Sequence, residues 1–205
     1  MLNKNIWALL LNTKNLLLFL CQHPHPLPTK DSFKMITIQP GKEEYYTAIH
    51  ELNVFAFGRE DEAELVTKLR KSSDFVQELS LVAVKDKKVV GHILFSPVAI
   101  HTKKRILPAL ALAPMAVHPE FQNRGIGSEL VRQGLERCRK LGYKVVIVVG
   151  HPTYYPRFGF ISARAKGLEA PFPVPDEAFM VIELTPGALN GISGMIIYPP
   201  AFEGV

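Results

Sequence analysis

The sequence predicts a mixed α/β domain organised around one sheet, and three observations support this class. Patterns of strands and helices follow one another as strand, helices, antiparallel strands, then strand–helix–strand. Hydrophobic residues make up 47% and charged residues 21% of the chain, which is ordinary globular composition and excludes disorder, collagen and coiled coil for most of its length. The length of 205 residues is that of one domain with extensions, since a domain takes about 150 residues.

The first strand and the two helices after it are recognised from local patterns. Residues Met35–Gln39 alternate as a strand does, and Pro40-Gly41 closes them. Apolar residues then recur at helical spacing, which predicts helices over Glu43–Phe57 and Glu60–Ser72. Leu81–Val84 and Val89–Phe95 are predicted strands, because the polar residues between them have the composition of a hairpin.

The second half of the chain predicts a strand–helix–strand unit followed by one more strand. Ile106–Val117 is a long apolar strand, and Pro114 within it indicates an edge or a bulge. Gly125–Leu141 has one apolar stripe and a charged opposite side, which is typical of a helix on a protein surface. Tyr143–Val149 is a β-branched run of the kind that is buried on both faces of a sheet, and Ala178–Leu184 is a further strand.

Residues 1–34 form a separate extension, so the predicted domain spans residues 35–205. Their apolar runs, Ile6–Leu11 and Leu16–Cys21, are shorter than the roughly 20 residues of a membrane-spanning helix, and they predict no stable membrane span. Three prolines between residues 24 and 28 favour an extended linker. Three interpretations stay open: a dispensable leader or misassigned start before Met35, a short membrane-touching helix, or a cleaved targeting peptide.

Charge and cysteine content restrict the partners and the compartment. The formal net charge is +5, but residues 1–34 hold four lysines against one aspartate, which leaves +2 on residues 35–205 and no argument for nucleic acid. Two cysteines, Cys21 and Cys138, provide neither a disulfide framework nor a four-thiolate zinc site. A reducing, cytoplasmic location is therefore expected, and no metal site is predicted.

The segment Met115–Ser128 carries the most specific chemical signal. A strand ends there, and a loop with Gly125 and Gly127 opens the amphipathic helix. Helix N-termini present unpaired N–H groups and partial positive charge, and glycines let that backbone approach a bound phosphate. A P-loop is excluded because no lysine follows Gly127, and Leu130 occupies the third glycine position of a dinucleotide fingerprint.

The remaining pattern, Gln122-x-x-Gly125-x-Gly127, resembles the acetyl-CoA loop of the GNAT superfamily of N-acetyltransferases. Downstream, Tyr155–Phe160 resembles the Tyr-x-x-x-Gly-Phe motif of that family, in the same order along the chain. Other segments resemble its YhbS-like branch: Glu62–Arg70, Phe95–Val98, and Leu189–Gly191 with Gly194 and Tyr198. The resemblance covers about Met35 to Phe202.

This resemblance implies a GNAT-like fold, with a mostly antiparallel sheet, flanking helices and one parallel strand pair that splays apart. Ile106–Val117 and Tyr143–Val149 are the matching strands, and Pro114 fits the bulge at the splay. Acetyl-CoA is the implied co-substrate, with its pantetheine arm in the gap. The implied contacts are the backbone of Met115, Ala116 and Val117 for pantetheine, and Gln122, Asn123, Arg124, Gly125, Ile126, Gly127 and Ser128 for pyrophosphate.

The implied reaction is direct attack of an amine on the acetyl thioester, with Tyr155 as the general acid for the leaving thiolate. The base is open among Glu62, Glu64, His92, His151 and a water chain. Tyr154 is expected to pack only, and Cys138 to be a helix core residue rather than a nucleophile.

The acceptor is a small-molecule or peptide amine of unknown identity, and residues 172–175 indicate an apolar wall for it. The protein is expected to be a monomer or a homodimer. The alternative is a non-catalytic acyl-CoA-binding or regulatory module on the same fold.

Overall fold

The computed structural model describes residues 36–203, so the three interpretations of residues 1–34 lie outside the described residues. Within that range the chain forms three α-helices and one nine-stranded sheet. The α-helices are α3 (Tyr46–Phe57), α4 (Asp61–Arg70) and α5 (Ile126–Lys140). The strands are β1 (Ile36–Pro40), β2 (Ser80–Lys85), β3 (Lys88–Thr102), β4 (Ile106–Val117), β5 (Val145–Val149), β6 (Ile161–Ser162), β7 (Leu168–Glu169), β8 (Phe179–Glu183) and β9 (Gly194–Ile197).

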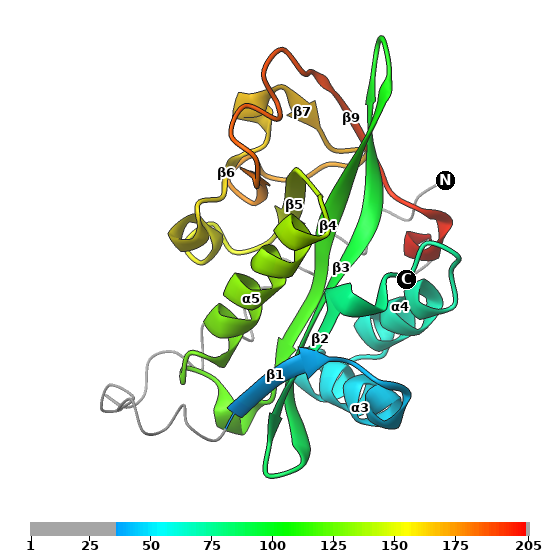
Figure 1. Cartoon of the computed structure of the whole chain (residues 1–205), viewed down its shortest axis with the longest axis vertical. Coiled ribbons are helices and arrows are strands. Elements are labelled where there is room, and N and C mark those ends of the chain that lie inside the picture. Colours follow the sequence, from blue (N-terminus) through cyan, green and yellow to red (C-terminus); the bar gives the residue numbers. More distant parts are fainter. Residues whose placement is uncertain (1–35, 204–205) are drawn as a thin grey trace.

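The sheet is mixed, as predicted (Figure 1). Strands β1 to β4 are antiparallel neighbours in chain order. Strand β5 then lies parallel to β4, with α5 as the crossover between them, and β8 and β6 complete that side in antiparallel fashion. Strand β9 pairs with the far half of β3 and with β7. The one parallel contact between long strands therefore lies in the middle of the sheet.

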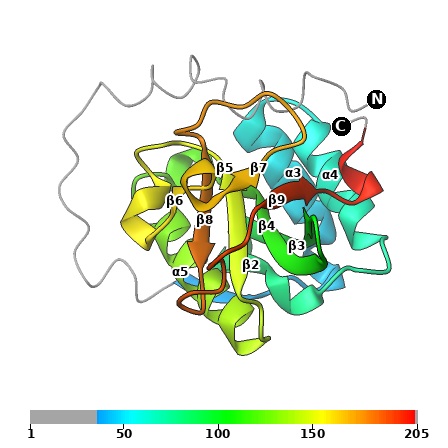
Figure 2. The same ribbon diagram turned by 90° about the horizontal axis from the view of Figure 1, so that it is seen from above.

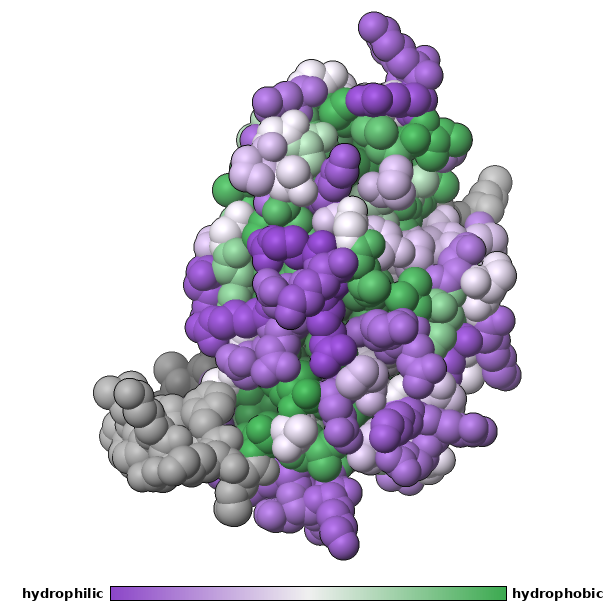
Figure 3. All heavy atoms as spheres, viewed as in Figure 1, coloured by the Kyte–Doolittle hydropathy of each residue, from purple (hydrophilic) through white to green (hydrophobic). Residues whose placement is uncertain are grey.

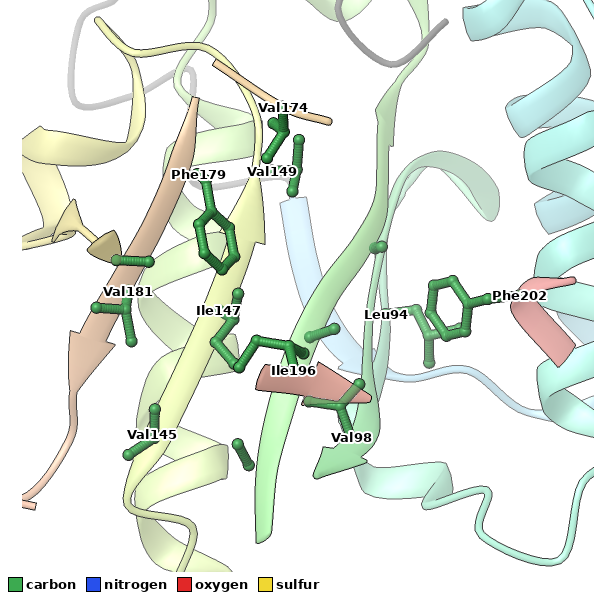
Figure 4. Close-up of a cluster of buried hydrophobic side chains, with 14 of the residues drawn as sticks. Leu94, Val98, Val145, Ile147, Val149, Val174, Phe179, Val181, Ile196 and Phe202 are labelled. Atoms are coloured by element: carbon green, nitrogen blue, oxygen red, sulfur yellow. The ribbon is translucent and has the colours of Figure 1, made fainter. Parts of the chain in front are cut away.

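The helices cover both faces of the sheet, as Figures 1 and 2 show from two directions. Alternate residues of each strand face opposite sides, so the sheet supports two cores. One core lies under α3 and α4, where Ile49 and Leu69 pack with strand residues that include Leu94 and Ile147 (Figure 4). The other lies under α5, where Leu130 meets its own set of strand residues.

Strand β3 runs further than the sequence predicts, from Lys88 to Thr102 rather than ending at Phe95. Pro97 would ordinarily end a central strand, because proline lacks the N–H group of the ladder. Here β2 pairs with β3 only as far as Leu94, and β9 begins only at Ala99. Pro97 therefore lies where β3 has a neighbour on one side alone, and its missing donor costs no ladder bond on the open side.

Strand β5 begins later than predicted, at Val145 rather than Tyr143. The backbone N–H of Tyr143 donates to the carbonyl of Cys138, and Gly142 adopts the left-handed conformation (φ 85°). This hydrogen bond caps the C-terminus of α5, because it occupies a carbonyl of the last helical turn. Tyr143 thus belongs to the cap of α5 rather than to β5.

Helix α5 packs closely on the sheet at Gly134. A methyl group at this position would lie 2.3 Å from Cε2 and 2.6 Å from Cζ of the buried Phe95 ring. The absence of a side chain therefore sets the distance between helix and sheet. Since the helix is a rigid element, this contact also fixes the position of its N-terminus.

Gly134→Ala is expected to destabilise the protein, although alanine favours helices by about 1 kcal/mol over glycine. Overpacking against Phe95 costs about 1–3 kcal/mol, so the free energy of unfolding in urea should fall. The same substitution in a Phe95→Leu background, where the ring is gone, should be neutral or stabilising. Equal effects in both backgrounds would contradict this account.

Candidate functional site

The central feature of the site is the gap between β4 and β5. These strands pair only at two positions, Leu110 with Val146 and Ala111 with Ile147. Beyond them β4 continues to Val117 with β3 as its only strand neighbour among the described residues. The backbone edge of β4 that faces β5 is therefore unpaired by any described strand, and such groups need hydrogen-bond partners. The splayed parallel pair expected from the resemblance is present.

A bulge lies on β4 at the same place. Ile93 of β3 pairs with Met115, whereas Phe95 pairs with Leu112. Between these two pairs the chain advances by three residues along β4 but by only two along β3. Strand β4 therefore has one extra residue in the stretch that contains Pro114. The bulge expected at Pro114 is confirmed. Such bulges turn backbone donors away from the ladder, in this case beside the gap.

The loop after β4 delivers the N-terminus of α5 to the gap. Asn123 and Gly125 both adopt the left-handed conformation, with φ values of 58° and 81°. Gly125 is the N-cap and no side chain caps the helix. The first N–H groups of α5, from Ile126 to Ser128, have no acceptors within the helix by its geometry. Together with the helix dipole they form a site for an anion.

The predicted loop residues play different parts. The Gln122 side chain donates to the carbonyl of Val117, 3.1 Å away, so it ties the loop to the end of β4. Arg124 is exposed, with its guanidinium 5.5 Å from the ring centre of Phe121. The Ile126 side chain is buried in the core under α5, which leaves only its backbone for a ligand.

Tyr155 begins a short 3-10 helix (Tyr155–Phe158) six positions after the end of β5. Its ring is packed so closely on Gly150 that a methyl group there would lie 2.3 Å from Cε2. It also makes an edge contact with Phe160, and only 7% of the residue is exposed. Burial raises the pKa of Tyr155, with a smaller increase from neighbouring Tyr154. The hydroxyl therefore carries its proton at neutral pH.

Tyr154 has a polar contact that the sequence did not predict. Its ring packs on Tyr155, as expected, but its hydroxyl lies 2.9 Å from the point where a methyl group on Gly127 would stand. Burial raises the pKa of Tyr154, and a hydrogen bond with Ser128 opposes that increase. Tyr154 thus reaches across the gap to the first turn of α5. Tyr154 and Gly127 are 27 positions apart in the sequence, so no local pattern predicts this contact.

The four candidate bases have different surroundings. Glu62 is buried in an ion pair with Arg59, and Glu64 is exposed on α4. His151 is half-buried in the turn before Tyr154, with its carbonyl accepting from the Tyr154 N–H. The remaining candidate, His92, is fully buried on β3. None of these positions singles out one base.

Other predicted residues lie in the core. Phe172 and Val174, two members of the predicted apolar wall, are buried with the core under α3 and α4, whereas Pro173 and Pro175 are exposed. Cys138 is buried in α5, and burial raises the pKa of its thiol to about 12. A thiol in that state is a poor nucleophile.

Residues 36–203 hold neither a membrane-spanning helix nor a cluster of metal ligands. No helix in that range is long and apolar enough to cross a membrane. The same residues contain no cluster of three or more histidine, cysteine or acidic side chains placed to hold a metal ion.

Known proteins resemble this chain in sequence and fold. A family model described as an acetyltransferase (GNAT) domain matches residues 37–163. YjhQ of Escherichia coli K12, an uncharacterised N-acetyltransferase, is 43% identical over 130 residues, which is 63% of this chain and 72% of YjhQ. YhbS from Escherichia coli, a GNAT family N-acetyltransferase solved in complex with CoA, is 31% identical with a TM-score of 0.76 over 88% of this chain and 96% of YhbS. A GNAT family acetyltransferase from Brucella melitensis in complex with acetyl-CoA is 29% identical, with a TM-score of 0.67 over 82% and 98% of the two chains.

His92 makes stability depend on pH. Burial, together with the positive charge of Arg70, lowers the pKa of His92 from 6.5 to about 3. Its ring nitrogens lie 3.1 Å from the Ser80 hydroxyl and 3.4 Å from the Asn53 amide nitrogen. The unfolded chain takes up a proton below pH 6.5 and the folded chain does not, so stability is present above that pH and is lost towards pH 3.

This dependence predicts a loss of about 2 kcal/mol through His92 between pH 7 and pH 5. Urea unfolding at both pH values should show that His92→Gln, which cannot titrate, loses less stability than the wild type by about that amount. Parallel pH profiles for the two proteins would show that the buried imidazole contributes nothing to the dependence.

Proposed function

Because the chain belongs to the GNAT acetyltransferase family, we propose that it transfers the acetyl group of acetyl-CoA to the amine of a small molecule or a peptide. The observation that carries the proposal is the uncapped N-terminus of α5 beside the gap between β4 and β5. The helix N-terminus fits a phosphate group. The gap beside it fits an extended arm that contains amide groups.

The residues of this chain fit that co-substrate. The unpaired edge of β4 at Met115, Ala116 and Val117 offers amide groups to the pantetheine arm, as an added strand would use them. The N–H groups from Asn123 to Ser128 would hold the pyrophosphate. Gly127 keeps the helix backbone open on that side, where a side chain would fill the space before Tyr154.

Tyr155 supplies the proton in the proposed reaction. The acceptor amine attacks the carbonyl carbon of the thioester, a backbone N–H at the bulge stabilises the oxyanion, and the carbon–sulfur bond breaks. Tyr155 gives its proton to the departing thiolate, and the amine loses one proton to a base or to water. Its raised pKa keeps the phenol protonated until that step.

A non-catalytic acyl-CoA-binding module remains the competing function. The position of Tyr155 argues for the enzyme, because its ring is held against Gly150 at the end of β5, beside the gap. A module that only binds has no need of an intact tyrosine there. The kinetic experiment below separates the two.

Acetyl-CoA binding is tested by thermal unfolding. A ligand at about 100 times its Kd adds about 2.7 kcal/mol to the native state, so the wild type should shift clearly upward. Gly127→Val should abolish most of that shift, because the side chain fills the space beside the first turn of α5. Gln133→Val, in the same helix but further from the loop, should retain it. No shift with acetyl-CoA, or equal shifts for both variants, would contradict the proposed binding site.

Tyr155→Phe removes only the hydroxyl, so acetyl-CoA binding should survive while kcat falls by about 10²–10⁴-fold. A panel of amines assayed for thiol release first identifies an acceptor. Tyr154→Phe is the matched comparison, since it loses a contact to Ser128 and should change the KM for acetyl-CoA more than kcat. A Tyr155→Phe enzyme within about threefold of the wild-type kcat would refute the general-acid assignment.

A further inference from the structure

The end of the sheet farthest from the Gln122–Gly125 loop carries large apolar side chains that no described helix covers. Strands β9, β3 and β4 lie side by side there, and Met195, His101 and Ile106 form one row of the register. Ile197 and Pro108 belong to the next row on the same face. Ile106 is 65% exposed, and Met195 and Ile197 are each 39% exposed. Aligned across three strands, they form a patch rather than scattered surface residues.

The patch lies on the α5 face of the sheet, just beyond the end of that helix. The intervening residues Ile100 and Ile196 are buried in the core on the other face. Leu141, 46% exposed, follows the last turn of α5. A pocket of about 260 Å³ opens between Leu141 and the start of β4. Pro108 lines it, and so do Ile100, Leu107 and Leu189, which belong to the core on the other face. We call Ile106, Pro108, Leu141, Met195 and Ile197 the tip surface. Figure 3 shows hydrophobic residues gathered below a projecting hydrophilic tip.

Positive charges surround the tip surface. The hairpin between β3 and β4 carries Lys103, Lys104 and Arg105, all exposed, and Lys144 lies at the rim of the pocket. None of these four makes an ion pair within residues 36–203. These exposed cations therefore give this end of the domain a local positive charge.

The nearby acidic groups are already engaged. Glu136 of α5 pairs with Arg139 and Lys140. Glu169 of β7, in register with Met195, pairs with Arg164. The surface therefore attracts negative charge from a partner rather than from its own acids.

We propose that the tip surface binds an acidic amphipathic helix of a partner protein. The apolar stripe of such a helix would cover the three-stranded floor, and its acidic flanks would meet the surrounding lysines and arginines. One large apolar side chain would enter the pocket as an anchor. The pocket is smaller than the roughly 300–1,000 Å³ of most small-molecule sites, which favours a single side chain over a separate ligand. This inference does not depend on the proposed acetyl transfer.

Other occupants fit less well. Residues 1–34 hold four lysines against one aspartate, so they share the charge of the surface. Nucleic acid would leave the aliphatic side chains uncovered. Helix α5, about 10 Å in diameter, stands above the sheet face beside the patch, so a flat bilayer cannot contact both levels at once. A helix can lie on the floor against the end of α5.

The test uses the full chain and a fluorescein-labelled synthetic helix of Leu, Glu and one Trp, with Leu at helical spacing, beside its scrambled isomer. The amphipathic peptide should bind and the isomer should not, with affinity falling as salt rises. Ile106→Ser/Met195→Ser and Lys103→Glu/Lys104→Glu should each weaken binding by about tenfold or more. Hydrogen exchange should slow at residues 99–108 and 194–197.

Matched controls keep the result specific. Ile161→Ser, an exposed apolar residue elsewhere, and Lys87→Glu/Lys88→Glu, in the hairpin at the opposite end of β3, should leave peptide affinity unchanged. All variants should keep the wild-type midpoint of urea unfolding, which shows that they fold. Absence of peptide binding, equal binding of the isomer, or full affinity in the tip variants would overturn the proposal. So would binding of phosphatidylglycerol vesicles without peptide binding, or self-association abolished by Ile106→Ser/Met195→Ser.

Discussion

The separation of β4 from β5 is the constraint on which the rest of the site depends. Two adjacent parallel strands normally satisfy each other's backbone along their whole length, yet these two pair at only two positions. Buried backbone groups without partners are costly, so the edge of β4 beyond Ala111 calls for an extended, amide-bearing molecule. The bulge near Pro114 belongs to the same arrangement, because it releases further backbone from the ladder on the β3 side.

Helix α5 converts that gap into a two-part site. Its charged and apolar sides are set by sequence, but its distance from the sheet is set by the contact between Gly134 and Phe95. This close packing holds the uncapped N-terminus beside the end of β4, where Gln122 ties the loop to Val117. An anion-binding end and an unpaired strand edge thereby lie next to each other. Neither feature alone indicates acetyl-CoA, but their adjacency supports the proposal that acetyl-CoA binds there.

The candidate site and the tip surface lie at opposite ends of the long strands β3 and β4. The Gln122–Gly125 loop follows the C-terminal end of β4, and the tip surface surrounds its N-terminal end. Strands this long connect the two ends rigidly, so a partner on the tip surface would leave the gap between β4 and β5 accessible. The proposed acetyl transfer and the proposed binding of a partner helix thus take place at different ends of one sheet.

Local patterns in the sequence determined much of this protein. The stripe of α5, the strands that flank it, the glycine loop and the bulge at Pro114 all depend on residues close together in the chain. Each can be predicted because spacing, glycine and proline act over a few residues. The family resemblance then supplied the parallel pair and its splay, which no local pattern specifies.

Only the tertiary structure decided the features that depend on strand register and burial. Pro97 remains within β3 because β2 and β9 leave that stretch open, and β9 itself is too short for an alternating pattern. The reach of Tyr154 to Gly127, the burial of His92 and the alignment of Ile106 with Met195 join residues far apart in sequence. Such contacts follow from how the whole chain packs, since neither spacing nor propensity encodes which distant residues become neighbours.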